Sequence, residues 1–300
     1  MGSSIGGYGT LRRMRRVSEH AWAEFLLWGC NPGFIATSEG ALLIDTPQQP
    51  IDALRWREHV VEHHGRIVHL VNTEPHPDHI RGNAYFPGVE VIGQAGMPRR
   101  YAAMIPMLTG VELGETLRQV DPDSVWLFNH PDYPPNPPTR TFDDRLVLEL
   151  GGLEIQLLHT PGHTAPQTAV FLPSEGVVFT GDNVFHKCKT FIQEADPWQW
   201  LATLDRIGQL DAEVIVPGHG EPCDKRYLVE QARVIRNWLS AIEDVVRRGL
   251  SEEDALVEAL PFAELDPYAL GQRLWPRWDE VNARNIRNLY TRVHDRVATA

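Results

Sequence analysis

Residues 73–79 carry four side chains of the kinds that bind metal ions. They read Thr-Glu-Pro-His-Pro-Asp-His and follow an apolar run. Because side chains two apart on an extended segment point the same way, Glu74 and His76 can face one ion. Imidazole and carboxylate groups are ordinary ligands of divalent metals such as zinc. The segment therefore predicts part of a metal site, with the ligand candidates Glu74, His76, Asp78 and His79.

Three other short motifs each add one ligand-type residue after an apolar run. A Pro-Gly-His turn carries His163, a Gly-Asp pair carries Asp182, and a second Pro-Gly-His turn carries His219. Glycine lets the backbone approach a crowded centre, and the ends of buried strands are rigid supports for ligands. Four such pieces in one chain are improbable by chance, so together they predict one site built from distant segments.

The elements that position these motifs can be read from the apolar pattern. Short runs rich in Val, Ile and Leu, bounded by Gly and Pro, are typical of strands, and longer amphipathic runs are typical of helices. The mixture favours a sandwich of sheets with helices outside. Helices are expected at 51–63, 79–85 and 197–208. Strands are expected at 22–28, 33–37, 41–45, 67–73, 89–92, 145–150, 153–158, 168–172, 177–180 and 213–216.

The chain divides into three parts. Residues 1–17 are expected to be a flexible arm, residues 18–223 the sheet domain, and residues 224–300 a helical region with apolar stripes. Within the sheet domain, residues 104–142 form a Pro-rich insertion that suits a lid or contact arm as well as a stiff surface connection. The stripes and the insertion together favour a homodimer contact.

The composition limits the classes of function. The chain has 300 residues and a formal charge of −12, which argues against a nucleic-acid partner because such partners require a basic surface. Its 3 Cys rule out a disulfide framework. It shows no apolar run of membrane-spanning length and no export signal. We therefore expect a cytoplasmic protein that binds neither membrane nor nucleic acid.

The four motifs resemble those of the metallo-β-lactamase superfamily, in the same order, over roughly residues 18–223. The resemblance implies an αββα sandwich, in which two mixed sheets are flanked by helices and the metals lie at one edge between the sheets. A helical C-terminal extension would follow. The resemblance implies one metal site at Glu74, His76 and His163 and another at Asp78, His79 and His219, with Asp182 bridging the two ions.

Glu74 departs from the family pattern, which usually has His at this position. A third carboxylate makes the metal centre less positive, and its oxygen is a harder ligand than imidazole, which shifts selectivity towards Mn or Fe. Zn²⁺ remains the expected cofactor because it accepts nitrogen and oxygen ligands. Two interpretations stay open: Glu74 ligates and two ions bind, or Glu74 does not ligate and the Asp78 side holds a single ion.

Metal-assisted hydrolysis is the activity that the resemblance implies. A metal-bound hydroxide would attack an electrophilic carbon, Asp78 would orient it and carry the proton, and Glu74 would share that work if it is not a ligand. We expect a small ester, lactone, thioester or amide as the substrate. Two alternatives are a hydrolytic dehalogenase of an activated aromatic halide, and a binding or regulatory protein that has kept the fold and metal but lost turnover.

Further residues lie close to the motifs in the sequence. His159 is four residues before His163 and is either a support for a ligand or a packed residue at a strand end. Phe185 stands where lactonases of the family usually have Tyr, which weakens a lactone as substrate. The other candidates for the surroundings of the metal or the substrate pocket also follow Asp182, namely Asn183, His186 and Cys188.

Overall fold

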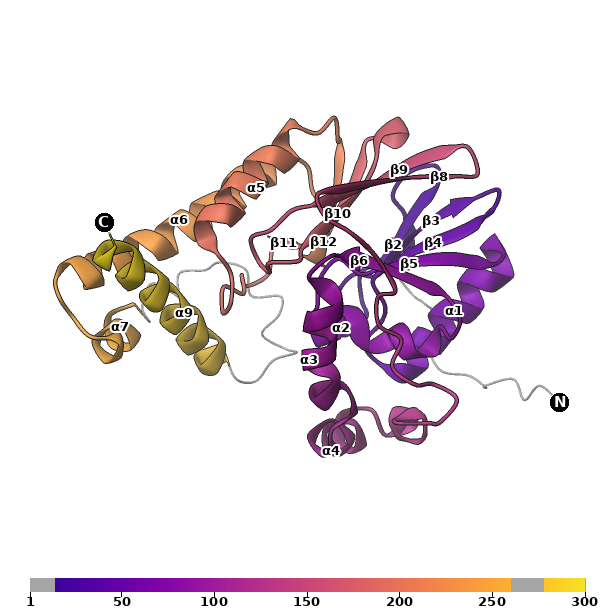
Figure 1. The fold of residues 1–300 in the computed structure, drawn as a ribbon, viewed down its shortest axis with the longest axis horizontal. Helices are drawn as coiled ribbons and strands as arrows, with labels where there is room; N and C mark the ends of the chain where they lie inside the picture. Colours follow the sequence, from indigo (N-terminus) through magenta and orange to yellow (C-terminus); the bar gives the residue numbers. More distant parts are fainter. Residues whose placement is uncertain (1–13, 260–277, 300) are drawn as a thin grey trace.

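The computed structural model describes residues 14–259 and 278–299, and its strands form two mixed sheets (Figure 1). Pairs from β1 to β4 are antiparallel and pairs from β4 to β7 are parallel. In the second sheet, β11 and β12 pair in parallel and the other neighbours are antiparallel. The first sheet has the order β1 (Met14–Arg16), β2 (Ala21–Glu24), β3 (Gly33–Thr37), β4 (Gly40–Ile44), β5 (Ile67–Val71), β6 (Glu90–Gln94), β7 (Arg140–Phe142). The second has the order β12 (Val214–Gly220), β11 (Val177–His186), β10 (Thr168–Leu172), β9 (Leu153–His159), β8 (Arg145–Leu150).

Alternating side chains of single strands build the layers. In β4, Leu42 packs between the two sheets, whereas Leu43 packs against helix α1 (Pro50–His64). In β10, Val170 packs between the sheets and Phe171 packs against the helices on the other side. Each sheet is therefore buried on both faces, which gives four layers. The predicted αββα sandwich is confirmed.

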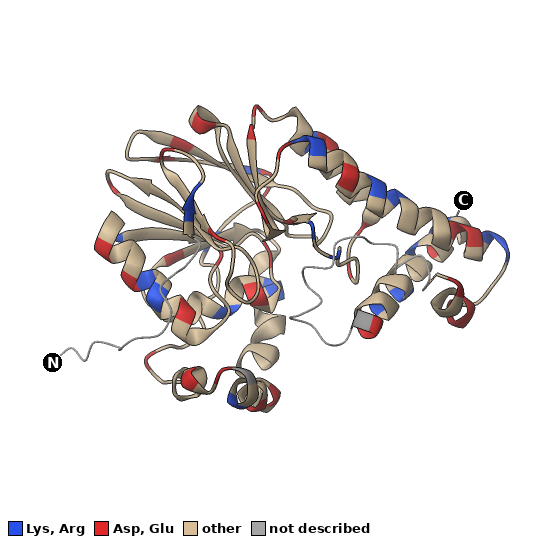
Figure 2. Ribbon diagram, turned by 180° about the vertical axis from the view of Figure 1, so that it is seen from behind, with Lys and Arg blue, Asp and Glu red and all other residues tan. Residues whose placement is uncertain are grey.

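Among the described residues, the C-terminal side of the molecule contains the helices α5 (Pro197–Gln209), α6 (Arg226–Arg247), α7 (Glu252–Glu258) and α9 (Trp278–Ala298). Trp200 of α5, Ile235 of α6 and Ile286 of α9 belong to one apolar core with Phe171 of the second sheet. Along the outer faces of α6 and α9, acidic and basic residues are interspersed (Figure 2). None of the described helices has an apolar stretch long enough to cross a membrane.

Residues 14–16 and the insertion at 104–142 differ from the expectation. Residues 14–16, expected in a flexible arm, form β1 and pair with β2, while residues 1–13 lie outside the described part. The insertion is largely helical, because α3 (Met97–Thr109) runs into it and α4 (Val111–Val120) and the 3-10 helix η2 (Pro122–Leu127) follow. Pro122 stands in the first turn of its helix, where a missing amide costs no hydrogen bond. The proline-rich composition concealed these helices.

Several predicted elements have other bounds in the structure. The strand expected at 22–28 stops at Glu24, whose carboxylate accepts hydrogen bonds from the next two backbone amides. The helix expected at 79–85 is a short α2 (Pro77–Ile80) followed by the 3-10 helix η1 (Arg81–Tyr85). A 3-10 turn, η3 (Pro173–Glu175), precedes β11, which continues past the expected 177–180 to His186 with register shifts against β12. This continuation includes Asp182.

Candidate metal centre

The loop after β5 carries the four ligand candidates of the first motif. Proline restricts the residue before it to extended backbone and fits the first turn of a helix. His76 is accordingly extended, with ψ of 147°, and Pro77 begins α2. Glu74 and His79 are fully buried, whereas the Asp78 side chain is 25% exposed. Asp78 therefore lies at the side of the centre that solvent reaches.

The glycines of the other motifs leave room for the candidate ligands and their supports. A Cβ at Gly218 would overlap Oδ1 of Asp182, so residue 218 must lack a side chain for Asp182 to keep its position. A Cβ at Gly162 would lie 2.6 Å from Cα of Trp200, which is tighter than real contacts. The Pro-Gly-His turns are thus close-packed on both sides of the centre.

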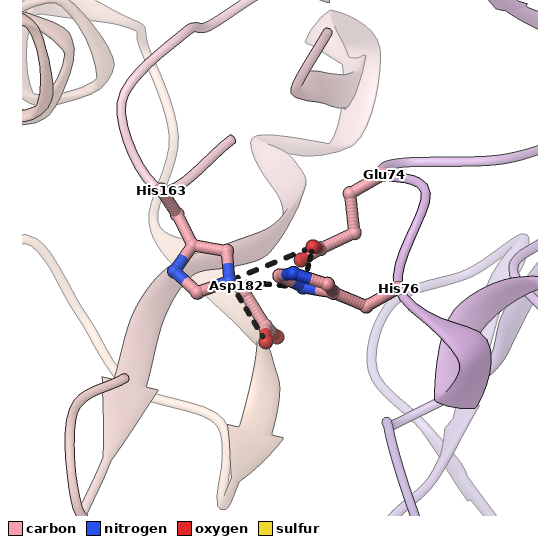
Figure 3. A group of neighbouring side chains, drawn as sticks. All are labelled: Glu74, His76, His163 and Asp182. Carbon is pink, nitrogen blue, oxygen red and sulfur yellow. Dashed lines mark hydrogen bonds and ion pairs between the residues drawn. The ribbon is translucent and has the colours of Figure 1, made fainter. Parts of the chain in front are cut away.

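Glu74, His76, His163 and Asp182 form one group of converging side chains (Figure 3). Oε2 of Glu74 lies 2.5 Å from Nδ1 of His76 and 3.5 Å from Nε2 of His163. Nε2 of His163 lies 3.2 Å from Nδ1 of His76 and 3.6 Å from Oδ2 of Asp182. The ligand-type atoms of the group all lie within 4.8 Å of one another.

Asp78, His79 and His219 form a second group next to the first. Oδ2 of Asp78 lies 3.2 Å from Nε2 of His219 and 3.9 Å from Nε2 of His79. Asp182 contacts this group as well: its Oδ1 is 3.3 Å from Nε2 of His79 and its Oδ2 is 3.4 Å from Nε2 of His219. The structure thus brings all seven ligand candidates together, with Asp182 between the two groups.

The charges and unpaired atoms of the cluster fit divalent cations. Nε2 of His79 and Oδ1 of Asp182 are buried and have no hydrogen-bond partner among the described residues, although they face each other. Burial opposes a positive charge on His219, but the carboxylates of Asp182 and Asp78 outweigh it and raise the pKa of His219 to about 10. Burial opposes a negative charge on Asp182, but His219 and His79 hold its pKa well below the usual range. Three carboxylates in this space call for cations, and nitrogen and oxygen donors suit zinc.

Asp45, which the sequence analysis did not single out, orients His79. Its Oδ2 accepts a hydrogen bond of 2.8 Å from Nδ1 of His79, which leaves Nε2 of His79 directed at the cluster. Both carboxylate oxygens of Asp45 also accept hydrogen bonds from Thr73, at 2.7 Å from its amide and 2.6 Å from its hydroxyl. Asp45 has φ of 55°, a left-handed conformation that Asp tolerates better than most residues. An Asp directly after an apolar strand was the available signal.

Two further groups hold the outward nitrogens of His163 and His76. Nδ1 of His163 donates to the carbonyl of Phe191 at 2.9 Å. Nε2 of His76 lies 3.1 Å from Oε1 of Glu194. Nη2 of Arg100 in α3 donates to both carboxylate oxygens of Glu194, at 2.8 and 2.6 Å. Hydrogen bonds of this kind set which nitrogen of a histidine is free to bind metal. The sequence offered no local signal for Glu194.

Phe185 and Asn183, two predicted neighbours of the centre, lie beside it. The Phe185 ring stacks on His219 with centroids 5.5 Å apart and meets His163 edge-on at 5.4 Å. Asn183 donates a hydrogen bond to the carbonyl of Thr160, and so fixes the turn that carries His163. Both residues restrict the movement of a candidate ligand.

His159, His186 and Cys188 are not placed among the ligand candidates. Nε2 of His159 donates to the carbonyl of Ala165, as expected for a packed residue at a strand end. Nδ1 of His186 donates to the carbonyl of Glu221, and its ring meets Tyr227 edge-on with centroids 4.5 Å apart. Cys188 is buried in the apolar core of the C-terminal helices. A part for these three residues in the surroundings of the metal or in the pocket stays a prediction.

The fold and the converging residues point to one class of proteins, and a comparison with known proteins identifies that class. Residues 26–219 match the metallo-beta-lactamase superfamily, and the chain belongs to this superfamily. It is 28% identical over 272 residues to a linear primary-alkylsulfatase of Pseudomonas sp. (strain ATCC 19151), which covers 79% of this chain and 50% of the relative. It is 24% identical over 253 residues to an atrochrysone carboxyl ACP thioesterase of Aspergillus fumigatus, which covers 81% and 69%.

Solved structures show the same fold. The sec-alkylsulfatase Pisa1 from Pseudomonas sp. is similar with a TM-score of 0.65 and 18% identity, over 93% of this chain and 50% of that chain. A metallo-beta-lactamase family protein from Thermus thermophilus is similar with a TM-score of 0.59 and 20% identity, over 88% of both chains. The chain thus spans about half the length of the alkylsulfatases that it matches.

Proposed function

We propose that this protein is a metal-dependent hydrolase whose centre is formed by the seven converging residues. One observation carries the proposal: four distant segments bring four imidazoles and three carboxylates together, and Asp182 contacts both groups of them. Superfamily membership and relatives named as an alkylsulfatase and thioesterases support hydrolysis as the reaction class. The proposed ligand set is Glu74, His76, Asp78, His79, His163, Asp182 and His219.

The residues of the cluster have separate tasks in this proposal. When bound, divalent ions would supply an acidified water and a polarised substrate oxygen. Asp78 is the best placed carboxylate to orient that water and to carry a proton, because its side chain is 25% exposed and its Oδ2 lies 3.2 Å from His219. Glu74 is fully buried, so we assign it to metal binding rather than to proton transfer.

Zn²⁺ is the proposed metal, in two sites that share Asp182. The residues that would hold the ions offer the nitrogen and oxygen donors that zinc accepts. The third carboxylate, Glu74, makes Mn²⁺ or Fe acceptable replacements because these ions favour harder ligands. Elemental analysis of the purified protein measures both the identity and the number of ions.

An acyl compound is the proposed substrate class, as an ester, thioester, lactone or amide. The relatives named as ACP thioesterases favour the thioester among these. A panel of model compounds tests the class with the metal-loaded protein. The panel should also include an activated aryl halide, since turnover of that compound alone would identify a dehalogenase instead.

A second substrate class, an anionic ester with an apolar tail, is favoured by the cavity beside Arg81. This cavity of about 200 Å³ is walled by Arg81 together with Tyr85, Tyr101 and Phe128. Nε of Arg81 is buried and has no hydrogen-bond partner among the described residues, and burial lowers the pKa of Arg81 against the opposing charge of Asp78. A partly buried cation beside mostly apolar walls suits an organic anion, such as the alkyl sulfates named for two relatives. Loss of alkyl sulfate turnover, but not of neutral ester turnover, in Arg81→Met would support this class.

The decisive experiment replaces ligand candidates singly and measures metal and turnover together. His79→Ala and His219→Ala should each lose bound metal and all hydrolysis, because each removes a nitrogen donor from the cluster. The same change at His63, an exposed residue of α1 whose Nδ1 donates to the carbonyl of His59, is the matched control. Hydrolysis that survives without metal would contradict the proposal. Metal retention without turnover of any panel compound would favour a metal-bound binding protein.

A further inference from the structure

Helix α9 contacts the loop at residues 187–196, and this loop contacts the metal centre. This helix lies outside the part of the chain that matches the superfamily, residues 26–219. The loop joins β11 to α5 and contains no helix or strand. Its backbone groups therefore need partners outside the regular hydrogen-bonding ladders. Three polar residues of α9 provide such partners, at spacings that place them on one helix face: Asn285, Asn288 and Arg292.

Asn285 and Asn288 bind the loop backbone through their side-chain amide groups. Oδ1 of Asn285 accepts from the amide of Ile192 at 2.8 Å, and its Nδ2 donates to the carbonyl of Thr190 at 3.1 Å. Nδ2 of Asn288 donates to the carbonyls of Ile192 and Ala195, at 2.6 and 2.9 Å. Asn285 is 1% exposed, so its amide is committed to these bonds.

Arg292 extends the same row by one helical turn. Its guanidinium donates to the carbonyl of Glu194 at 3.1 Å and to Oδ1 of Asn288 at 3.0 Å. A further guanidinium nitrogen lies 3.5 Å from the carboxylate of Asp196, which caps α5. The row thus fixes the loop from Thr190 to Asp196.

The other side of this loop touches two candidate ligands. The carbonyl of Phe191 accepts from Nδ1 of His163, and the carboxylate of Glu194 lies 3.1 Å from Nε2 of His76. In both rings the opposite nitrogen faces the cluster, because Nε2 of His163 and Nδ1 of His76 lie 3.2 Å apart there. Phe191 lies between Thr190 and Ile192, and Glu194 between Ile192 and Ala195, so both contacts come from the backbone stretch that the two asparagines hold.

We propose that Asn285 and Asn288 of α9 are positioning residues for the metal centre. By holding the loop, they place the Phe191 carbonyl and the Glu194 carboxylate, which set the tautomer and the ring orientation of His163 and His76. The inference rests on the proposed metal-binding role of these two histidines. It assigns to the C-terminal helix a part in the site that the superfamily-matched region does not contain.

A purely structural role for α9 makes a different prediction. Ile286, Leu289 and Val293 pack α9 into the apolar core of the second sheet. If α9 served only this core, removing the two amides while keeping the apolar stripe would lower stability without changing the metal centre. The experiment must therefore read the histidines and the metal directly.

The test uses the double variant Asn285→Ala/Asn288→Ala, with Arg287→Ala as the matched control. Arg287 lies on a different face of α9 and pairs with Glu252 at 3.5 Å. In the double variant we expect a 10- to 100-fold loss of metal affinity in chelator competition. A loss of about this size is typical when a residue that hydrogen bonds to a ligand histidine is mutated. We also expect altered visible absorption bands of the Co²⁺-substituted protein. The control should match the wild-type protein in both.

A second readout keeps this inference separate from the proposed function. Nitrogen-15 NMR of the metal-free wild-type chain should show His163 as the Nδ1–H tautomer, and the double variant should show a mixture of tautomers. Unchanged tautomers together with unchanged Co²⁺ bands would overturn the positioning role. If the wild-type chain bound no metal at all, the proposed function would fail while the tautomer result still decided the role of α9. Glu194→Gln, at a side chain that is 31% exposed, provides a folded variant if the double variant does not fold, and should alter the bands through His76.

Discussion

Gly218 leaves free the space that Oδ1 of Asp182 occupies. A Cβ at position 218 would overlap this oxygen, which lies 3.3 Å from Nε2 of His79. Gly218→Ala should therefore displace Asp182 from between the two groups. We expect metal content to fall by at least half in elemental analysis, with the circular dichroism spectrum unchanged.

Gly208→Ala provides the control for this substitution. Gly208 lies in α5, where a Cβ would meet Cδ1 of Leu228 at an ordinary 3.7 Å. Alanine favours the helix over glycine by about 0.5–1 kcal/mol, so this variant should be equally stable or more stable and should keep its metal. Full metal content in Gly218→Ala would show that Asp182 is not a shared ligand.

Asp45→Asn tests the support of His79. The side-chain oxygens of Asp45 accept three hydrogen bonds. In Asn one of these oxygens is replaced by an NH2 group, which is itself a donor and cannot accept a hydrogen bond from these partners. Asn tolerates the left-handed conformation at this position, so the backbone should be kept. We expect a metal affinity lower by roughly 10- to 100-fold, measured by chelator competition. An affinity equal to that of wild type would leave Asp45 with a role in folding alone.

Glu74→Gln distinguishes a ligand from a neighbour. A neutral amide is a poor ligand, and Glu74 lies within 3.5 Å of His76, His79 and His163. We expect elemental analysis to show a fall from two ions per chain to one. Glu74→His, which offers a nitrogen donor in place of the carboxylate, should keep two ions. Two ions in the Gln variant would remove Glu74 from the ligand set.

Asp52 predicts a pH dependence of stability that is independent of the metal. Burial raises the pKa of this carboxyl to about 6 in the folded chain, although Arg55 opposes the shift. The folded state then binds this proton more tightly than the unfolded state does. The free energy of unfolding of the protein therefore falls as pH rises from about 4 through about 6. Because the pKa values of the folded and unfolded states differ by about two, the loss is on the order of 3 kcal/mol.

Asp52→Asn removes this titration without changing shape. Urea unfolding should show the variant to be more stable than wild type by that amount at pH 8 and about equal at pH 4. Equal stability of the variant and the wild-type protein at both pH values would contradict this, because it would mean that ionisation of Asp52 does not lower the free energy of unfolding.

The sequence was most informative where ligand-type residues stand next to Pro and Gly at the ends of apolar runs. His163 and His219 could be selected because a Pro-Gly turn fixes the local backbone whatever surrounds it. Asp45 and Glu194 could not be assigned, since their roles depend on which strand or loop lies beside them in space. The helices at 97–120 were missed because prolines near them favoured irregular structure. The assignment of ligand roles, the homodimer and the cytoplasmic location stay predictions.

Contacts of α9 with the loop at 187–196 bear on how this enzyme can be rebuilt. A chimaera that received residues 26–219 from a relative would import all seven proposed ligand positions but would pair a foreign loop with the resident Asn285 and Asn288. Loop and helix would have to be exchanged together for the graft to work. The segments that must be kept together for this site therefore extend beyond the domain that defines its family.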